Sequence, residues 1–444
     1  MPKILRVINR FNLGGPIYNA AYLTKYLAPE FTTLLVGGMK EESEQASEFI
    51  AQNLGVDYRI IPEMRRAVHP VSDFSAYNKI KTIIREFKPD IVHTHAAKAG
   101  ALGRLAALSC RVPVIVHTFH GHVFHSYFGS FETAAYKKVE RYLAKKTSGI
   151  IAISEAQKDE LVNVHRIAPA EKVHLIPLGF DLQRFNDNLE EKRKDFRAKH
   201  NLTDEVAIGI VGRLVAVKNH GLFLEAIRFV SAKSRQKIRA FIIGDGEERQ
   251  NLESKAADLL LNACSNGQRL VEFISWEREV DKVYPGLDVV CLTSFNEGTP
   301  VSLIEAQAAG RPIVSTNVGG IENVVLPNRT ALLSAASDKQ KFFENLLKLV
   351  EEETLRYEMS KEGWNHVREK FHYTRLVGDV RRLYETLIAQ AHFAPTHPTA
   401  SATHNRPPTA PVAPGRSDWV GFPVPRKGTD GFPASGSRGS GLPH

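Results

Sequence analysis

The sequence has little cysteine and no long apolar run. The three cysteines of the 444-residue chain, Cys110, Cys264 and Cys291, are odd in number and widely spaced. This pattern argues against a disulfide framework and a zinc site, so we interpret them as core thiols. No apolar run approaches the roughly 18 residues that a membrane-spanning helix needs. Because the N-terminus begins with a strand pattern, Lys3–Ile8, rather than a signal peptide, we expect a cytoplasmic protein.

Nucleic-acid motifs are also missing, although the chain is basic. The formal net charge is +9, and the residues from Phe393 onward hold five basic and two acidic side chains. The residues before Phe393 therefore carry only about two thirds of the excess positive charge. This mild excess suits an anionic ligand or an anionic lipid surface. We find no zinc-finger spacing and no RNP-type motif, so we expect no nucleic-acid partner.

The last 52 residues differ sharply in composition from the rest. They hold ten of the 23 prolines and seven of the 31 glycines, mixed with Ser, Thr and Ala. Such a segment cannot form a packed core, so we predict a disordered tail over residues 393–444.

Before the tail, short apolar runs alternate with helical or polar segments, which predicts an α/β fold with doubly wound parallel sheets. A chain of this length exceeds the size at which one hydrophobic core keeps growing. We expect two similar domains, residues 1–183 and 184–372, that face each other across a cleft, followed by a helix over 373–392. The predicted strands are Lys3–Ile8, Thr32–Val36, Tyr58–Ile61, Asp90–Thr94, Pro113–Thr118, Gly149–Ile153, Val173–Ile176, Val206–Val211, Arg239–Ile243, Leu270–Ile274, Leu287–Leu292, Pro312–Thr316 and Ala331–Leu333.

One stretch between two of these strands combines two carboxylates with a helix start. Thr299 is predicted to cap a helix that has Pro300 at its first position and ends near Gly310. A helix N-terminus at a strand end is suited to phosphate. Glu297 and Glu305 flank this point, and carboxylates beside an anion site are better employed in binding hydroxyl groups. Without further support, the stretch could equally be scaffold.

Three other strand ends carry glycine or positive charge. Gly14-Gly15 follows the first strand and would let a ligand approach the backbone. In the second half, Arg213 can bind phosphate oxygens with its planar fork, and Lys218 adds a compact second charge, so the two could neutralise a diphosphate. Gly244-Asp-Gly246 is a turn but lacks the third glycine of a dinucleotide fingerprint.

Histidines cluster after the fourth and fifth predicted strands. The segments are His93-Thr-His95 and His117-Thr-Phe-His120-Gly-His122-Val-Phe-His125. No Asp or Glu lies nearby and no His-x-Glu-x-x-His order occurs, so we expect no metal. Ligands bind at the carboxyl ends of parallel strands, so we expect at least one histidine to face a ligand.

The segment Phe131–Lys146 predicts a basic amphipathic helix. Its apolar stripe is Tyr136, Val139 and Leu143, and its basic residues lie elsewhere. The helix could present an ordinary solvated face or contact an anionic membrane surface.

Taken in order, these motifs resemble the family 4 glycosyltransferases, retaining enzymes of the GT-B fold with two Rossmann-like domains. The resemblance covers roughly residues 3 to 390. The segment Thr94–Arg104 also resembles a subgroup that often builds bacterial surface polysaccharides on polyprenyl-linked acceptors. The matching pieces are Gly14-Gly15, Lys88-Pro-Asp-Ile-Val-His-Thr-His95, Thr118-Phe-His120-Gly, Ile176-Pro-Leu-Gly-Phe-Asp181, Gly212-Arg213-Leu with Lys218, Gly244-Asp-Gly246, and Glu297-Gly-Thr-Pro300 with Glu305.

The resemblance implies a role for each matching residue. Arg213 and Lys218 would hold the donor diphosphate, while Glu305 would bind the ribose and Glu297 the transferred sugar. His120 would lie beside the reacting centre. The donor would also meet Gly15, Gly298, Thr299 and Pro300. The last helix would cross back onto the first domain. Gln307 stands where a methionine is common, on the helix beyond the carboxylates.

The function implied is transfer of a sugar, with retention, from a nucleotide-diphosphate sugar, most simply UDP-linked, to a glycan or polyprenyl-linked acceptor. No metal or other cofactor is expected, because Arg213 and Lys218 supply the positive charge and no Asp-x-Asp triplet is present. The acceptor would place the enzyme in the cytoplasm or peripherally on the inner face of the plasma membrane. Two alternatives are a sugar-nucleotide 2-epimerase of the same fold and a non-catalytic nucleotide-sugar-binding protein.

Overall fold

A computed structural model describes residues 1–12, 15–40, 47–65, 67–120, 130–262, 264–265 and 268–393. Within these ranges, the side chains of residues 130–135, 264, 265, 268 and 393 are excluded from the description. The predicted disordered tail lies outside the described residues apart from its first residue. Gly14, His122 and His125 also lie outside them.

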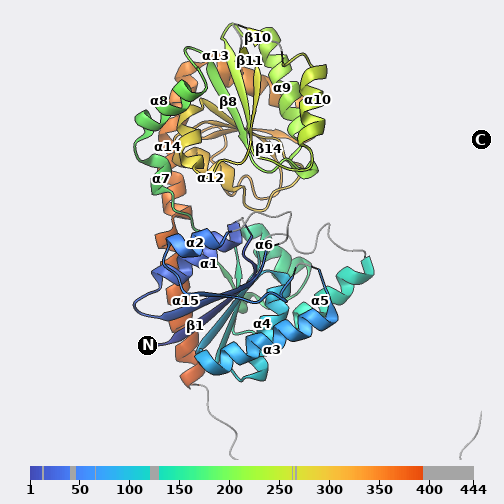
Figure 1. Cartoon of the computed structure of the whole chain (residues 1–444), viewed down its shortest axis with the longest axis vertical. Coiled ribbons are helices and arrows are strands. Elements are labelled where there is room, and N and C mark those ends of the chain that lie inside the picture. Colours follow the sequence, from blue (N-terminus) through green and yellow to red (C-terminus); the bar gives the residue numbers. More distant parts are fainter. Residues whose placement is uncertain are drawn as a thin grey trace, which may run out of the picture. The chain divides into compact units, whose positions relative to one another are not determined.

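The first domain contains a sheet of seven strands in the order β3-β2-β1-β4-β5-β6-β7, with every neighbouring pair parallel (Figure 1). The strands β4 and β5 are buried at every residue, as expected for a parallel sheet covered on both faces. The strands are β1 Lys3–Arg10, β2 Thr32–Gly38, β3 Tyr58–Ile60, β4 Ile91–His95, β5 Val114–Thr118, β6 Gly149–Ala152 and β7 Val173–Leu175.

Alternate residues of these strands pack against different helices. Ile4 of β1 lies with α1 and α15, whereas Leu5 and Val7 lie with α3 and α4 on the opposite face. The helices of this domain are α1 Gly15–Tyr26, α2 Glu48–Asn53, α3 Pro70–Phe87, α4 Ala97–Ser109, α5 Ser130–Lys146, α6 Glu155–Asp159, η1 Glu160–Val164 and η2 Ala170–Lys172.

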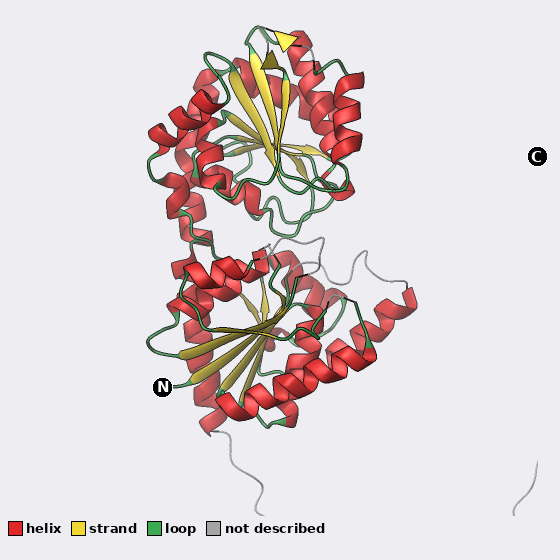
Figure 2. Ribbon diagram, viewed as in Figure 1, coloured by secondary structure: helices red, strands yellow, loops and turns green. Residues whose placement is uncertain are grey.

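The second domain contains a six-stranded parallel sheet in the order β12-β9-β8-β13-β14-β15 and a small antiparallel pair (Figure 2). The pair, β10 Cys264–Ser265 and β11 Gln268–Arg269, was not predicted, because two-residue strands leave no periodic pattern. The sheet strands are β8 Val206–Val211, β9 Ile238–Ile243, β12 Val271–Ile274, β13 Val289–Leu292, β14 Ile313–Asn317 and β15 Ala331–Ala335.

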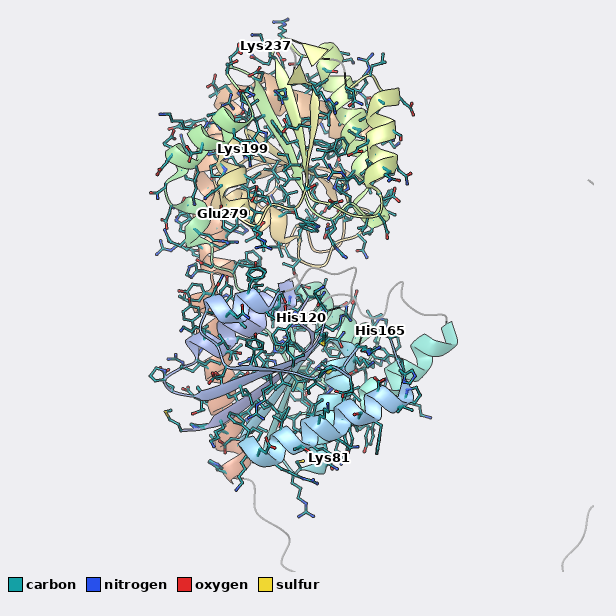
Figure 3. All side chains as sticks on the ribbon, in the orientation of Figure 1. Lys81, His120, His165, Lys199, Lys237 and Glu279 are labelled. Carbon is teal, nitrogen blue, oxygen red and sulfur yellow. The ribbon has the colours of Figure 1, made fainter. Side chains whose placement is uncertain are left out.

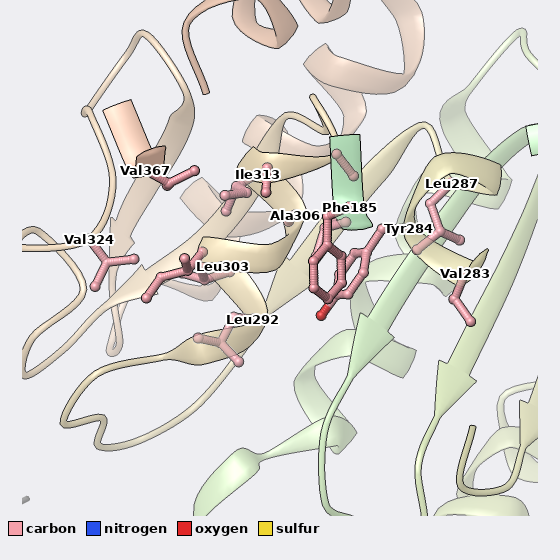
Figure 4. Packing of buried hydrophobic residues seen from close by; sticks show 14 of the residues in the cluster. Phe185, Val283, Tyr284, Leu287, Leu292, Leu303, Ala306, Ile313, Val324 and Val367 are labelled. Carbon is pink, nitrogen blue, oxygen red and sulfur yellow. The ribbon is translucent and has the colours of Figure 1, made fainter. Parts of the chain in front are cut away.

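Helices cover both faces of this sheet as well. One core joins α12 and α14 to the sheet through residues such as Leu303, Ile313 and Val367 (Figure 4). The helices of this domain are α7 Gln183–Asn186, α8 Leu189–Lys199, η3 Ala216–Lys218, α9 His220–Lys233, α10 Arg249–Asp258, α11 Val280–Val283, η4 Tyr284–Gly286, α12 Val301–Ala308, α13 Lys339–Glu351 and α14 Glu353–Phe371. A further helix, α15 Tyr373–Phe393, follows them in the chain.

The last helix, α15, belongs to the core of the first domain, as expected from the crossover prediction. Its buried face packs against β1, β4 and β5. The residues of that face are Leu376, Val377, Val380, Leu383, Tyr384 and Leu387. Burial of each aliphatic side chain contributes about 1.5–3 kcal/mol, so this contact is a large part of the stability of the first domain.

Both sheets contain a point where the strand order reverses. In the first sheet it lies between β1 and β4, and in the second between β8 and β13. Open α/β sheets bind ligands beside such points, at the carboxyl ends of the strands. The loops after β1, β4, β8 and β13 carry most of the predicted site residues.

Candidate active site

In the second domain, the loops that follow β8 and β13 are joined by hydrogen bonds. The backbone N–H of Phe295 donates to the carbonyl of Val217 over 2.9 Å, and Thr293 Oγ1 donates to the carbonyl of Lys218 over 2.9 Å. These bonds tie together the two segments that hold Lys218 and Glu297. The loops therefore form one unit at the reversal point of the sheet.

Lys218 and Glu297 form an ion pair inside this unit. Lys218 Nζ lies 2.5 Å from Glu297 Oε1, and the hydroxyl of Ser294 donates to the same oxygen over 2.6 Å. Glu297 is buried, and Lys218 is about one fifth exposed. The ion pair neutralises the buried carboxylate of Glu297, and the exposed part of Lys218 remains open to an anionic ligand.

Arg213 is exposed on the same loop, and the turn after β9 supports its backbone. Leu214 N–H donates to the carbonyl of Asp245 over 2.9 Å. A Cβ at Gly244, where φ is +141°, would lie 1.9 Å from the carbonyl oxygen of Gly212. The Gly-Asp-Gly turn thus allows two loop backbones to touch, which explains its glycines without a dinucleotide.

The loop after β14 supports Glu297 in a similar way, which we did not predict. Gly320 N–H donates to the carbonyl of Glu297 over 2.9 Å. A Cβ at Gly319, where φ is +54°, would lie 2.0 Å from that carbonyl oxygen. The signal was available in the sequence, because a Gly-Gly pair directly follows a predicted strand.

The start of α12 differs from the prediction by one residue. Pro300 occupies the N-cap position with ψ of 95°, and no side chain caps the helix, so the predicted Thr299 cap is wrong. The extended ψ of Pro300 delays the first helical residue to Val301. The helix ends as predicted, before Gly310, whose φ is +65°.

Glu305, on α12, does not contact Glu297 directly but is paired with a tyrosine. The hydroxyl of Tyr284 donates to Glu305 Oε2 over 2.9 Å. Burial raises the pKa of Glu305 to about 7, and the Tyr284 hydrogen bond and the nearby Arg184 oppose this shift. The carboxyl therefore titrates near neutral pH. Nothing in the sequence linked Tyr284 to it, because the two are joined only by the fold.

In the first domain, the histidines predicted as ligand-facing form a stacked group. The rings of His93 and His95 lie 4.2 Å apart, and His95 Nδ1 lies 2.8 Å from His120 Nε2. His93, His95 and His117 are completely buried. His120, which Figure 3 labels, is partly exposed. Three histidines are thus core residues, and His120 retains access to solvent.

The environment keeps these histidines neutral. Burial lowers the pKa of His120 to about 4. Burial also lowers the pKa of His93 and His95, and Arg6 adds to the shift at both. For His117 the causes are burial and then Arg104. At neutral pH the group can exchange hydrogen bonds but carries no charge.

A buried arginine and a tyrosine from α15 complete this group. Arg6 Nη1 lies 2.8 Å from His93 Nδ1 and donates to the hydroxyl of Tyr384 over 3.1 Å. His93 Nδ1 must accept from Arg6, so the ring proton is on Nε2, which lies 2.7 Å from Thr118 Oγ1. Tyr384 is 291 residues from His93, and no local pattern could join them.

The basic helix α5 presents a different face from the predicted one. Val139 is 49% exposed, so the predicted stripe of Tyr136, Val139 and Leu143 is wrong at its centre. Glu140 takes the inward position and forms a fully buried ion pair with Arg104 of α4, in which Arg104 Nη2 donates to both carboxylate oxygens. The exposed face carries Lys138, Val139, Arg141, Tyr142, Lys145 and Lys146. Arg141 also donates to the carbonyls of residues 165 and 166.

No group of three His, Cys, Asp or Glu side chains within the described ranges is arranged to hold a metal ion. Nor does any helix there combine the length and apolar character needed to cross a bilayer.

Comparison with known families matches both domains. Residues 20–184 match the model "Glycosyltransferase Family 4", and residues 192–366 match "Glycosyl transferases group 1". The chain belongs to the family 4 glycosyltransferases. The two matches adjoin at the domain boundary and include His120, Arg213, Lys218, Glu297 and Glu305. They confirm the resemblance seen in the sequence of this glycosyltransferase.

Relatives of this glycosyltransferase include two bacterial glycosyltransferases that align with about three quarters of the chain. It is 28% identical to the Escherichia coli UDP-Gal:alpha-D-GlcNAc-diphosphoundecaprenol alpha-1,3-galactosyltransferase, over 74% of this chain and 83% of the relative. It is 25% identical to the Staphylococcus aureus capsular polysaccharide biosynthesis glycosyltransferase CapM, over 75% and 86%.

A solved structure shares the fold. The crystal structure of Anabaena Alr3699/HepE in complex with UDP matches with a TM-score of 0.72 at 17% identity, over 86% of this chain and 100% of that one. The predicted α/β architecture of two Rossmann-like domains is therefore confirmed as GT-B.

Proposed function

We propose that this glycosyltransferase moves a sugar, with retention of the anomeric configuration, from a UDP-sugar to a polyprenyl-diphosphate-linked glycan. The observation that carries the proposal is the Lys218–Glu297 pair at the reversal point of the second sheet. The E. coli relative is named for a UDP donor and a diphosphoundecaprenol acceptor. The HepE neighbour was solved with UDP.

In this proposal, the second domain binds the donor. Arg213 and Lys218 hold the diphosphate and stabilise the charge that grows on it as the sugar departs. When the donor binds, Lys218 contacts phosphate as well as Glu297, and Glu297 becomes free to accept hydrogen bonds from the sugar hydroxyls. Glu305 binds the ribose, and Gly298, Thr299 and Pro300 line the donor.

The first domain would supply the groups beside the acceptor. His120 contacts the reacting centre as a neutral ring, since its pKa of about 4 keeps it uncharged. Gly15, at the first residue of α1, lets the diphosphate or acceptor approach closely. The departing phosphate takes the acceptor proton, so no side chain must act as a base. Positive side chains stabilise the leaving group, and no metal is required.

Mass spectrometry of one reaction tests the proposal directly. The purified protein is mixed with pooled UDP-, GDP- and ADP-sugars and GlcNAc-diphosphoundecaprenol, and the lipid fraction is analysed. A mass increase by one sugar is expected, from a UDP-sugar and in the presence of EDTA. An isomerised donor without acceptor, seen by proton NMR, would indicate the epimerase instead. Donor binding by calorimetry with neither reaction would indicate a sensor.

We also propose that α5 holds the enzyme at an anionic membrane surface. Its exposed face combines Lys138, Lys145 and Lys146 with the exposed Val139 and Tyr142, and each lysine near such a surface contributes about 1 kcal/mol. Replacing the three lysines by alanine should weaken co-sedimentation with phosphatidylglycerol vesicles about a hundredfold. Three exposed lysines of the second domain, Lys199, Lys237 and Lys339, provide a control with the same change in charge. Equal binding of the two variants would indicate that α5 presents an ordinary solvated face.

A further inference from the structure

We propose that an exposed apolar face at the start of α3 binds the isoprenoid chain of the lipid-linked acceptor. This inference rests on the proposed function and adds a location for the part of the acceptor that does not react. The face consists of Val68, Val71 and Phe74, and we call it the α3 face.

The α3 face is unusually exposed for its composition. Val68, Val71 and Phe74 are 82%, 74% and 67% exposed. They follow one another at intervals of three residues across the N-cap residue His69, so the two helical members lie on one side of α3. Phe74 also stacks on Tyr77, with ring centroids 6.4 Å apart. Adjoining exposed apolar side chains of this kind mark a contact site rather than ordinary surface.

The α3 face lies at the ligand-binding edge of the first sheet. Because β3 ends at Ile60 and α3 begins at Pro70, the start of α3 follows the carboxyl end of a strand that is parallel to its neighbour β2. The backbone N–H of Ile61 donates to the carbonyl of Gly37, at the end of β2, over 2.8 Å. His95, the last residue of β4, and His120, two residues after the end of β5, lie at this same edge.

A buried ion pair fixes the α3 face relative to those histidines. Lys98, on α4, lies 2.5 Å from Asp73 Oδ1 and also donates to the carbonyl of Ala67. Asp73 Oδ2 accepts from the backbone N–H of His69 over 3.1 Å. Both members of the ion pair are mostly buried. The start of α3 is thereby attached to the first turn of α4.

The first turn of α4 in turn follows the histidine group directly. His95, which contacts His120, is separated from α4 by Ala96 alone. Ala96 has φ of +64° and ψ of 169°, a combination that residues other than glycine rarely adopt. This sharp turn persists because the surrounding structure holds it. A continuous set of contacts therefore joins His120, at the proposed reacting centre, to the α3 face.

The charge of the α3 face favours an isoprenoid chain over lipid headgroups. Between Val68 and Asn78 the ionisable residues are His69, Asp73 and Tyr77, and Asp73 is already paired with Lys98. Of the basic residues that border this stretch, Lys79 is paired with Glu63, and Arg65 is exposed. The face of α5, in contrast, carries several lysines, which suit anionic headgroups. A neutral apolar face is not attracted to negatively charged lipid headgroups, but it can remove a bound hydrocarbon chain from contact with water. The isoprenoid of the proposed acceptor has this chemistry.

Binding experiments with two diphosphates of equal headgroup charge test the inference. The probes are undecaprenyl diphosphate and dimethylallyl diphosphate in detergent micelles, with affinities measured by thermophoresis. The full-length protein should bind the long chain more than tenfold more tightly. The double variant Val71→Ser and Phe74→Ser should lose about tenfold in affinity for the long chain and keep its affinity for the short one. Both side chains are exposed, so the fold should survive.

A matched control and a labelling experiment complete the test. Leu260→Ser with Tyr357→Ser removes two equally exposed apolar side chains from the second domain and should leave both affinities unchanged. A benzophenone placed on the undecaprenyl chain should label the tryptic peptide of residues 67–79. Labelling only elsewhere would overturn the inference. So would an α3 variant that loses binding to plain anionic vesicles yet keeps its chain-length preference, because the face would then be a membrane contact.

These readouts are separate from the proposed function. If the pooled-donor reaction yields no glycosylated lipid, the proposed function fails, whatever the chain preference. If that reaction succeeds and the α3 variant behaves as the wild type in both binding experiments, only the inference fails.

Discussion

The two domains share one architecture but equip equivalent edges with different chemistry. At the reversal point of the second sheet, Lys218 and Glu297 hold charges that neutralise each other. At the reversal point of the first, His93, His95 and His120 are kept neutral by burial. A charged site suits a diphosphate leaving group, and a neutral polar site suits hydroxyl groups. The comparison shows that the shared fold positions a site at the same edge of each sheet. The burial and pairing of the local side chains then determine which chemical groups each site suits.

The largest effect on activity is expected from removing positive charge from the candidate site of the second domain. Arg213→Ala should slow turnover by roughly 10²–10³, the usual effect of losing one group that stabilises transition-state charge. Arg235→Ala, at an exposed position of the same domain, is the control and should keep wild-type turnover. Steady-state kinetics with the identified donor measure both. Near-normal turnover of the Arg213 variant would remove this residue from the proposed mechanism.

Acid should affect the first domain before the second. The folded-state pKa values of His93, His95, His117 and His120 lie below the unfolded value of about 6.5, whereas in the second domain His220 is the buried histidine with such a shift among the described residues. Stability from these groups is complete above the unfolded pKa and is lost as the pH falls towards the folded pKa. Between pH 7 and 5 we expect the first domain to lose a few kcal/mol, measured by urea unfolding with domain-specific proteolysis as the probe. His95→Asn cannot gain this proton and should reduce the acid sensitivity. Simultaneous acid unfolding of both domains would contradict the assignment.

Breaking the Lys218–Glu297 pair should have a moderate effect on stability. Lys218→Met leaves Glu297 buried and unpaired, so we expect a loss of about 1–3 kcal/mol in urea unfolding. The double variant Lys218→Met and Glu297→Gln should recover most of this loss but no activity. An additive double variant would show that the two residues do not interact in solution.

The smallest expected effect concerns Glu305, because burial keeps this carboxyl group partly protonated near neutral pH. Its folded pKa of about 7 lies above the ordinary value of 4.5. Stability from this group is complete below pH 4.5 and is lost as the pH rises through 7. Glu305→Gln should therefore raise the melting temperature at pH 8, by a few degrees, and leave it unchanged at pH 4.5. A constant difference across this range would mean that Glu305 keeps an ordinary pKa.

The succession of strands along the chain and their parallel arrangement could be predicted from the sequence, because each buried parallel strand is a compact apolar run. The sequence also placed Lys218 and Glu297 at strand ends, where the structure joins them. The interior partners could not be predicted. Tyr284 reaches Glu305, and Tyr384 reaches His93, only through the fold. The inward position of Glu140 could not be predicted either, because a buried Arg–Glu pair has the same residues as an exposed one.

The dependence of the first domain on α15 has a consequence for biosynthesis. The apolar face of α15 completes the core around β1, β4 and β5, but its residues are made some 280 positions after those of β4. Domains usually fold as they leave the ribosome, the N-terminal one first. Here the first domain to be synthesised is among the last to finish folding. The second domain can form beforehand, so the ribosome has translated nearly the whole enzyme before the first domain closes its core.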